Sequence, residues 1–313
     1  MNKRNGKIYK SGIKHMRKNK VELYSMCIIP VLLLFVFCYI PMFGVVIAFK
    51  DYRFDLGIFG SKWVGFKNFE FLFQSQDFVR IVRNTLGLNA LFIVLGLIFA
   101  VTFALLMFEL RSRRAVKVYQ TVYMIPNYLS WVIVGYMSYA LLNPKYGFVN
   151  QILRIFGSDG VDWYSQPMYW PAILATASVW KSLGVNTIIY YASLMGMNEE
   201  YVEAAKIDGA TKLQCTWHIV LPHLFPLMTI MTILSIGNIF RADFGLFYQL
   251  TRDIGALYPT TDVLDTYIYR VMKTIGDLSM SSAVGLLQST VGFVLIVLTN
   301  YIVNKIDPER ALF

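Results

Sequence analysis

Six long apolar stretches constrain the fold of this chain more than any other feature of its sequence. A helix that crosses a bilayer takes about 20 mostly apolar residues. Stretches of that kind cover residues 21–48, 84–108, 118–142, 169–194, 218–240 and 282–304. Since 56% of the 313 residues are hydrophobic and only 15% are charged, the sequence predicts an all-α integral membrane protein with six transmembrane helices.

The basic residues indicate how these helices are oriented. The formal net charge is +10, and the first 20 residues carry eight Lys or Arg side chains and no acid. A second basic group follows the second stretch and consists of Arg111, Arg113, Arg114 and Lys117. Because Lys and Arg accumulate on the cytoplasmic side of membrane helices, we expect both termini to be cytoplasmic. Basic residues placed beside apolar spans also argue against a nucleic-acid partner.

This orientation divides the chain into four parts. They are a basic cytoplasmic tail at 1–20, a first helix with an external loop at 21–83, a five-helix core at 84–304 and a cytoplasmic tail at 305–313. Segments 143–168 and 241–281 are expected outside. Their aromatic residues, such as Trp163, Tyr164 and Tyr248, fit either contact with an external partner or an aromatic belt at the membrane interface.

The sequence shows no spacing typical of a catalytic, metal or nucleotide site. Cys27 and Cys38 lie eleven positions apart in one predicted helix, roughly 16 Å by the helical rise, which is too far for a disulfide. The pair Gly6-Lys7 is not followed by Ser or Thr, so it is no phosphate-binding loop. We therefore expect no metal, no bound cofactor and no covalent chemistry in this chain.

A polar connection at residues 198–222 separates the fourth and fifth stretches. Asn198 can cap a short helix, and Gly209 can adopt the left-handed conformation that ends one. Small side chains at Ala204 and Ala205 allow close backbone approach. The acids Glu199, Glu200, Glu203 and Asp208 outnumber the basic residues Lys206 and Lys212, which is unusual for a short cytoplasmic loop. From these residues alone, a partner surface and an ordinary amphipathic turn both remain open.

The connection carries a recognisable motif. Glu203-Ala204-Ala205, three residues, Gly209, nine residues, Ile219, one residue and Leu221-Pro222 resembles at every fixed position the EAA loop of permease subunits of binding-protein-dependent ABC importers. Further similar segments are Trp63 to Phe69, Arg83-Asn84-Thr85 and Asn304 to Glu309. Together they cover most of the chain and resemble the carbohydrate-uptake branch, in particular LplB-like oligosaccharide permeases.

The resemblance implies a type I ABC importer permease fold in a bacterial cell membrane, with the loop acting as a cytoplasmic coupling helix. The residues expected to couple to a separate ATPase are Glu203, Ala204, Ala205, Asp208, Gly209, Ile219, Leu221 and Pro222. In that family Glu203 would face a basic residue of the ATPase. The implied partners are a second permease subunit, two copies of a cytoplasmic ABC ATPase that binds ATP and Mg²⁺, and an extracytoplasmic solute-binding protein.

A substrate path is expected along the fourth stretch. Lys181 lies near its middle, where a cation costs roughly 3 kcal/mol unless it is solvated or paired. Trp180, Lys181, Asn186 and Tyr191 offer the aromatic faces and polar groups that suit a saccharide. Helix packing is the competing interpretation, and it is favoured for Gly184 and Thr187. Beyond the fifth stretch, Arg241 and Asp243 either line the outer mouth or form an exposed ion pair.

The sequence therefore predicts the permease subunit of an ATP-driven oligosaccharide importer, which performs no covalent chemistry itself. An importer of a different solute is one alternative. An ion-coupled secondary transporter is a weaker one, because no buried acid accompanies Lys181. An intramembrane enzyme would need a nucleophile with a base, or a metal pair, within the spans. The predicted spans contain neither, which argues against this alternative.

Overall fold

The computed structural model describes residues 24–110, 112–157, 159–198 and 200–308. The basic tail before residue 24, together with Arg111, Glu199 and Arg310, lies outside the described residues. Within the described part, five helices are long and apolar enough to cross a membrane: Tyr24–Phe49, Phe78–Phe108, Pro167–Met195, Lys212–Gly237 and Leu278–Ile306. The chain forms two compact units, one made of residues up to 70 with 277–283, the other of 71–276 with 284–313.

The first unit joins the first long helix to a small hairpin. After the π-turn Phe35–Tyr39, α2 (Ile40–Met42) and a 3₁₀ turn Phe43–Phe49, strand β1 (Lys50–Asp51) pairs antiparallel with β2 (Lys62–Trp63) around α3 (Gly57–Gly60). The Trp63 to Phe69 segment closes onto Phe49, whose ring centroid lies 5.8 Å from Trp63 and 5.5 Å from Phe66. Asn68 donates to the carbonyls of Ala48 and Lys50 at 2.8 and 2.9 Å. Helix α4 (Lys67–Gln74) follows.

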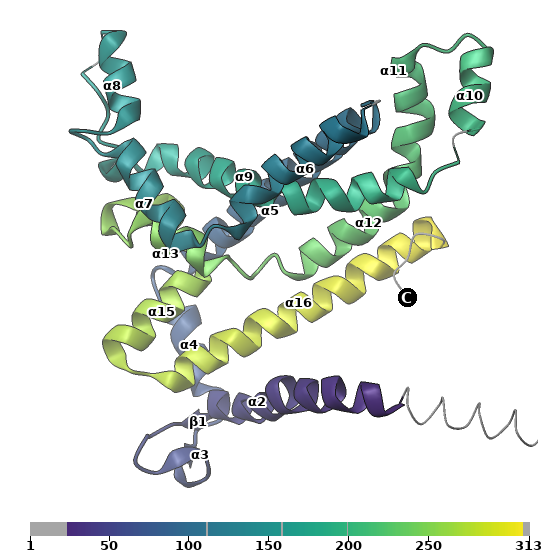
Figure 1. Cartoon of the computed structure of the whole chain (residues 1–313). Coiled ribbons are helices and arrows are strands. Elements are labelled where there is room, and N and C mark those ends of the chain that lie inside the picture. Colours follow the sequence, from purple (N-terminus) through teal and green to yellow (C-terminus); the bar gives the residue numbers. More distant parts are fainter. Residues whose placement is uncertain (1–23, 111, 158, 199, 309–313) are drawn as a thin grey trace, which may run out of the picture. The chain divides into compact units, whose positions relative to one another are not determined.

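The second unit is a bundle of long helices with short helices at its ends (Figure 1). Its elements are α5 (Phe78–Phe108), α6 (Arg113–Tyr128), α7 (Trp131–Leu142), α8 (Phe148–Ile155), α9 (Trp170–Met195), α10 (Glu200–Ile207), α11 (Lys212–Cys215), a π-turn (Thr216–Val220), α12 (Leu221–Gly237), α13 (Phe244–Thr251), α14 (Tyr258–Thr261), α15 (Leu264–Ile275) and α16 (Leu278–Ile306). Helices α5 and α9 pack along each other at its centre. Between α8 and α9, and before α14, the chain makes the 3₁₀ turns Trp163–Ser165, Pro167–Tyr169 and Gly255–Leu257.

The third predicted span is not one helix. The sequence predicted a continuous helix over 118–142, whereas the structure ends α6 at Tyr128 and starts α7 at Trp131. Leu129 and Ser130 are extended, with ψ angles of 135° and 150°. Pro126 has no amide donor for the last turn of α6, and the Ser130 hydroxyl accepts from the Ile133 amide at 3.3 Å, capping α7. The prediction of one unbroken helix is therefore wrong.

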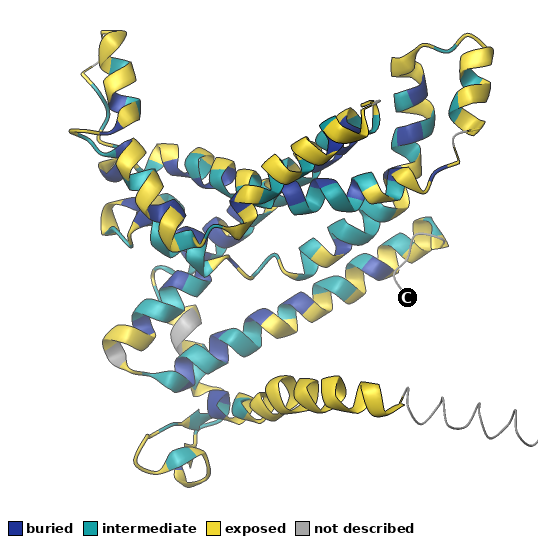
Figure 2. Cartoon of the chain, in the orientation of Figure 1, coloured by how far each residue is buried: buried dark blue, intermediate teal, exposed yellow. Residues whose placement is uncertain are grey.

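Two apolar clusters hold the bundle together. One, around Trp170, Leu174 and Phe247, lies where α7, α9 and α13 meet, and the other, around Ala104, Leu194 and Leu224, joins α5, α9 and α12. Tyr164 is buried in the first cluster rather than exposed. Figure 2 shows that buried residues run along α5 and α9 while α6 and α7 expose much of their surface. Apolar residues exposed on helices of this length are expected where lipid or another subunit covers them.

Candidate functional site

The predicted helix, glycine turn and second helix are present at residues 198–222. Asn198 begins α10 as predicted, because its side-chain oxygen accepts from the Glu200 amide at 3.1 Å. Gly209 has a φ of +87° and ends the helix. Its amide donates to the Lys206 carbonyl at 3.1 Å, and the next amide, of Ala210, donates to the Ala205 carbonyl at 2.9 Å. This pair of bonds satisfies the last carbonyls of α10 in a Schellman arrangement.

The second helix of this elbow, which we define as residues 198–222, is fixed by its own cap. Thr211 and Gln214 form a capping box, in which the Thr211 amide donates to the Gln214 side-chain oxygen at 2.8 Å. Cys215 and Val220 are buried, and Val220 packs in the cluster of Leu194 and Leu224. The elbow is therefore anchored to the bundle through α11 and the π-turn, while α10 buries no residue completely.

The predicted coupling residues divide into two sets by exposure. Glu203, Ala204, Asp208 and Gly209 are exposed, whereas Ala205, Ile219, Leu221 and Pro222 are half-buried. A hollow of about 460 Å³ on the elbow brings together Ala205, Asp208, Gly209 and Ile219. Leu221 and Pro222 instead begin α12.

The exposed face of α10 also carries two apolar residues that the sequence analysis missed. Ile207 is 86% exposed and Tyr201 is 65% exposed. Large apolar side chains held open to solvent beside a turn are typical of a surface that a partner covers. The available signal was their place beside the motif, Tyr201 two positions before Glu203 and Ile207 two positions after Ala205.

Glu203 lies in a different hollow from the rest of its motif. It lines a space of about 390 Å³ together with Arg113, Lys206 and Lys212. Glu203 makes no ion pair with any residue that the structure describes. This space adjoins the end of α5 and the start of α6, so the elbow and Arg113 lie at the same end of the second unit (Figure 1).

Lys181 is bound by backbone rather than by an aqueous cavity. Its ammonium donates to the carbonyls of Leu129 at 2.6 Å and Asn127 at 2.9 Å, with Pro126 at 3.4 Å. It also lies 5.2 Å from the ring centroid of Trp131. The Pro126 carbonyl also accepts from the Leu129 amide at 3.2 Å, whereas those of Asn127 and Leu129 follow the last turn of α6, so Lys181 caps that helix from α9.

The face of α9 that packs against α6 is set by small side chains. A Cβ at Gly184 would lie 2.2 Å from the Tyr123 carbonyl oxygen, so only glycine allows this approach. Thr187 is fully buried, and its hydroxyl has no hydrogen-bond partner among the described residues. Both positions serve helix packing in this structure.

A polar cavity lies between α5, α9 and α12. It has a volume of about 420 Å³, and its polar lining includes Asn89, Ser178, Ser182, Asn186, Thr232 and Ser235. Asn186 is half-buried, and its amide makes no hydrogen bond with a described residue. A polar, partly open space between apolar helices can take a ligand rich in hydroxyl groups.

The structure brings only Asn186 of the four predicted path residues into this cavity. Trp180 and Lys181 lie on a neighbouring face of α9, and Tyr191 lies near the elbow in the hollow of Glu203. The cavity face is the row Ser178, Ser182, Asn186 and Tyr190, spaced four residues apart.

Arg241 and Asp243 both line the cavity and are not paired with each other. Asp243 caps α13 by accepting from the Leu246 amide at 3.2 Å, and it accepts from the Trp131 indole at 2.7 Å. Arg241 forms no ion pair with a described residue. The cavity therefore has one carboxylate that is already bonded and one guanidinium whose charge acts on the nearby carboxylate of Asp265.

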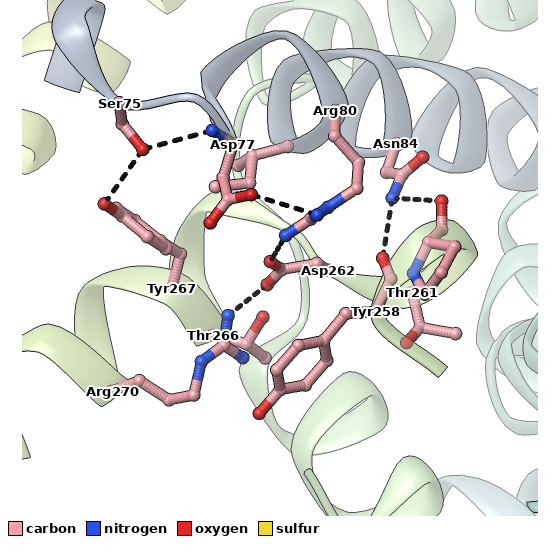
Figure 3. A network of polar contacts seen from close by, with 12 residues as sticks. Ser75, Asp77, Arg80, Asn84, Tyr258, Thr261, Asp262, Thr266, Tyr267 and Arg270 are labelled. Carbon is pink, nitrogen blue, oxygen red and sulfur yellow. Dashed lines mark hydrogen bonds and ion pairs between the residues drawn. The ribbon is translucent and has the colours of Figure 1, made fainter. Parts of the chain in front are cut away.

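A charged network ties the start of α5 to α14 and α15 at the other end of the unit (Figure 3). Asp262 is 1% exposed and pairs with Arg80 at 3.2 Å and with Arg270. Arg270 also pairs with Asp253 at 2.9 Å. Burial alone would lower the pKa of Arg270, but hydrogen bonds and the charge of Asp262 outweigh it, and the pKa is raised.

The Arg83-Asn84-Thr85 segment belongs to the same junction. The Asn84 amide donates to the Pro259 carbonyl at 3.2 Å, and the Leu264 amide donates to the Thr85 hydroxyl at 3.0 Å. The sequence indicated this segment by its resemblance, but no residue pattern indicated the residues that it contacts. Asp262 and Arg270 were not predicted, because they pair with residues about 180 and 8 positions away and no periodicity reports such a pairing.

Comparisons with known proteins agree on one class. Residues 92–308 match the family model "Binding-protein-dependent transport system inner membrane component". The chain is 35% identical to the protein LplB of Bacillus subtilis (strain 168) over 300 residues, covering 95% of this chain and 94% of LplB. It is 34% identical to the polygalacturonan/rhamnogalacturonan transport system permease protein YteP of the same organism over 287 residues, covering 92% and 89%.

Solved structures agree with the sequence relatives. A chain of a bacterial ABC transporter involved in the import of the acidic polysaccharide alginate superposes with a TM-score of 0.82 at 30% identity, covering 94% of this chain and 99% of that one. A chain of a bacterial alginate ABC transporter in complex with alginate pentasaccharide-bound periplasmic protein gives a TM-score of 0.81 at 31% identity, covering 92% and 96%.

Proposed function

Because this chain belongs to the family of binding-protein-dependent transport system inner membrane components, we propose that it forms half of the path of an ATP-driven oligosaccharide importer. It is a multi-pass membrane transport subunit and not an enzyme. The observation that carries the proposal is the polar cavity of about 420 Å³ between α5, α9 and α12, which lies in a unit whose other end bears the elbow.

The substrate class follows from the cavity and from the relatives together. Hydroxyl and amide side chains such as Ser182 and Asn186 pair with sugar hydroxyl groups, and apolar residues such as Phe92 and Leu246 accept the C–H faces of the rings. The permease YteP and the alginate transporter are both named for polysaccharide transport. The path residue that we favour from the sequence and the cavity is Asn186.

The elbow is the proposed contact with the ATPase. Its exposed residues Glu203, Asp208 and Ile207 offer two acids and one apolar side chain to a partner surface, which suits a basic and apolar groove. Two copies of a cytoplasmic ATPase would bind ATP and Mg²⁺, and their closure would move the elbow and open the cavity to the other side. A second permease and an extracytoplasmic binding protein complete the assembly.

This role fixes the proposed orientation. The elbow, the start of α6 and the end of α16 face the cytoplasm, and both termini lie there, while α8 and α13 to α15 lie outside. In a variant whose Cys27, Cys38 and Cys215 are replaced by Ser, a cysteine introduced as Ile207→Cys at this exposed position should react with a membrane-impermeant maleimide only after the cells are opened. Labelling of intact cells would refute the cytoplasmic elbow.

The decisive experiment is uptake by the assembled importer in proteoliposomes. Uptake of a labelled oligosaccharide should require binding protein outside and ATP inside, and an imposed ion gradient without ATP should give none. Glu203→Lys should abolish coupling while membrane insertion persists, and Glu200→Lys, outside the motif, is the matched control. Normal coupling in Glu203→Lys would refute the role of the elbow.

An ion-coupled secondary transporter finds no support in the site. Such a transporter needs an ionisable group in a span that binds and releases the driving ion. Lys181 is the ionisable residue at the middle of α9, and its ammonium is held by three carbonyls. These contacts support a helix-capping role for Lys181 rather than the binding and release of a driving ion.

A further inference from the structure

Another hollow, separate from those described above, lies between α7 and α13, at the carboxyl end of α13. It has a volume of about 200 Å³, and its side chains include Tyr136, Tyr139, Tyr248, Gln249 and Arg252. It shares no lining residue with the larger cavity. No acid lines it, so Arg252 gives it a net positive charge.

The walls of this hollow are rigid. A Cβ at Gly135 would lie 2.8 Å from the Gln249 carbonyl oxygen, so the backbones of α7 and α13 are in direct contact. The Tyr248 ring stacks on Phe244 at 4.9 Å and meets Tyr269 edge-on at 5.1 Å. Rings fixed in this way need no ordering when a ligand binds.

Arg252 adopts an unfavourable backbone conformation at the edge of the hollow. Its φ of 57° and that of Asp253, 52°, are the positive values found for non-glycine residues in the described chain. This left-handed region is unfavourable for residues other than glycine. Asp253 is held there by Arg270 at 2.9 Å and by the Tyr258 hydroxyl at 3.1 Å.

The Arg252 side chain, unlike the Asp253 carboxylate, is held by an aromatic ring. Its guanidinium carbon lies 4.3 Å from the ring centroid of Tyr139. The guanidinium makes no hydrogen bond or ion pair with any residue that the structure describes. The strained backbone therefore places a stacked guanidinium, with free N–H groups, beside three tyrosine rings and a glutamine.

These groups match one kind of sugar. Tyrosine rings pack on the C–H face of a pyranose, the Gln249 amide pairs with hydroxyl groups, and a free guanidinium binds a carboxylate through two parallel hydrogen bonds. We propose that the hollow is an external subsite for one uronate unit, a pyranose that bears a carboxylate, of the incoming oligosaccharide. This inference rests on the proposed importer function.

Helix α13 links this subsite to the main path. Arg252 follows its last residue, and Arg241, which lines the larger cavity, lies three residues before its first. The eight residues of α13 span about 12 Å. An acidic oligosaccharide bound at Arg252 thus meets a second guanidinium along its way into the bundle.

The test compares two probes in the reconstituted importer with its companion subunits and binding protein. The probes are a galacturonate tetramer and its methyl ester, which has the same rings without the charges. Arg252→Gly removes the guanidinium and relieves the positive φ, so the variant should be at least as stable as the wild type. It should raise the half-saturating concentration of the acidic tetramer about tenfold and leave that of the ester unchanged.

Control variants separate the contributions. Arg252→Lys keeps the charge but loses the planar fork, and it should fall between Arg252→Gly and the wild type. Arg154→Gln removes an exposed guanidinium of α8, which donates to the carbonyls of Lys145 and Pro144 among the described residues, and it should leave both probes unaffected.

The following results would refute the proposed uronate subsite. An unchanged half-saturating concentration for the acidic tetramer in Arg252→Gly refutes it directly. An equal loss for both probes means that Arg252 supports the local backbone instead. If the wild type transports the ester but not the acid, the subsite fails while the importer function stands. If ATP drives uptake of neither probe, the subsite fails, and the uptake experiment described above with other oligosaccharides decides the importer function separately.

Discussion

Replacing Lys181 with Met tests whether this lysine caps α6 or serves the substrate. Two of its carbonyl contacts are short, at 2.6 and 2.9 Å, and a hydrogen bond to a charged group contributes about 1.5–3 kcal/mol. The carbonyls keep some access to solvent or to one another after the change, so we expect a loss near the lower end, about 2–4 kcal/mol in all. Methionine keeps the length and the apolar contacts of the side chain.

That loss predicts a measurable shift in thermal unfolding. For 313 residues, an unfolding entropy of roughly 2.1 cal/mol/K per residue gives about 0.66 kcal/mol/K. Lys181→Met should therefore lower the unfolding temperature of the purified protein by about 3–6 °C, followed by tryptophan fluorescence in detergent. Lys117→Met, which changes an exposed lysine of α6, should shift it by less than about 1 °C. An unchanged unfolding temperature together with impaired uptake would refute the cap and return Lys181 to the substrate path.

Three further changes have expected outcomes. Asp262→Asn leaves Arg80 and Arg270 without their shared buried partner and should destabilise the protein by about 3–5 kcal/mol, whereas Asp55→Asn, in an exposed pair, should change stability by less than about 1 kcal/mol in the same thermal scan. Gly209→Val should cost about 1–2 kcal/mol because of the φ of +87° alone, since no atom lies within 4 Å of the added Cβ, and faster proteolysis at the elbow would report it. Burial raises the pKa of Asp265, although hydrogen bonds from Ala242 and Gln288 act to lower it. The folded state therefore binds this proton more tightly than the unfolded state. The stability of the wild type relative to Asp265→Asn should accordingly fall as pH rises from about 4 towards 7. A stability difference that rises over this range would contradict the sign.

The sequence was sufficient to place five of the six predicted spans, because a bilayer imposes a minimum length of apolar residues. It also located both helices of the elbow, since Asn198, Gly209 and the capping residues act on their own neighbours. These signals are local, and local signals can be read without knowing what packs where.

The break at Leu129 and Ser130 was missed because it lies within an apolar stretch, where hydropathy does not report it, although Pro126 and Ser130 were local signals of it. The face of α9 that meets the cavity depends on tertiary contacts instead. On α9, the row through Ser178, Ser182 and Asn186 and the row through Trp180, Gly184 and Tyr191 both alternate small and polar groups. Which row meets the cavity depends on the rotation of the helix, and Gly184 fixes that rotation by its contact with Tyr123.

The break between α6 and α7 has a mechanical consequence for a helix that must move. Backbone hydrogen bonds weaken as they depart from their preferred length and direction. A continuous helix therefore resists bending of its axis. Here the free carbonyls at the end of α6 are held by the four-carbon tether of Lys181, which can follow them as the two halves tilt. The segment between α6 and α7 can therefore act as a hinge whose carbonyls keep their hydrogen bonds to Lys181.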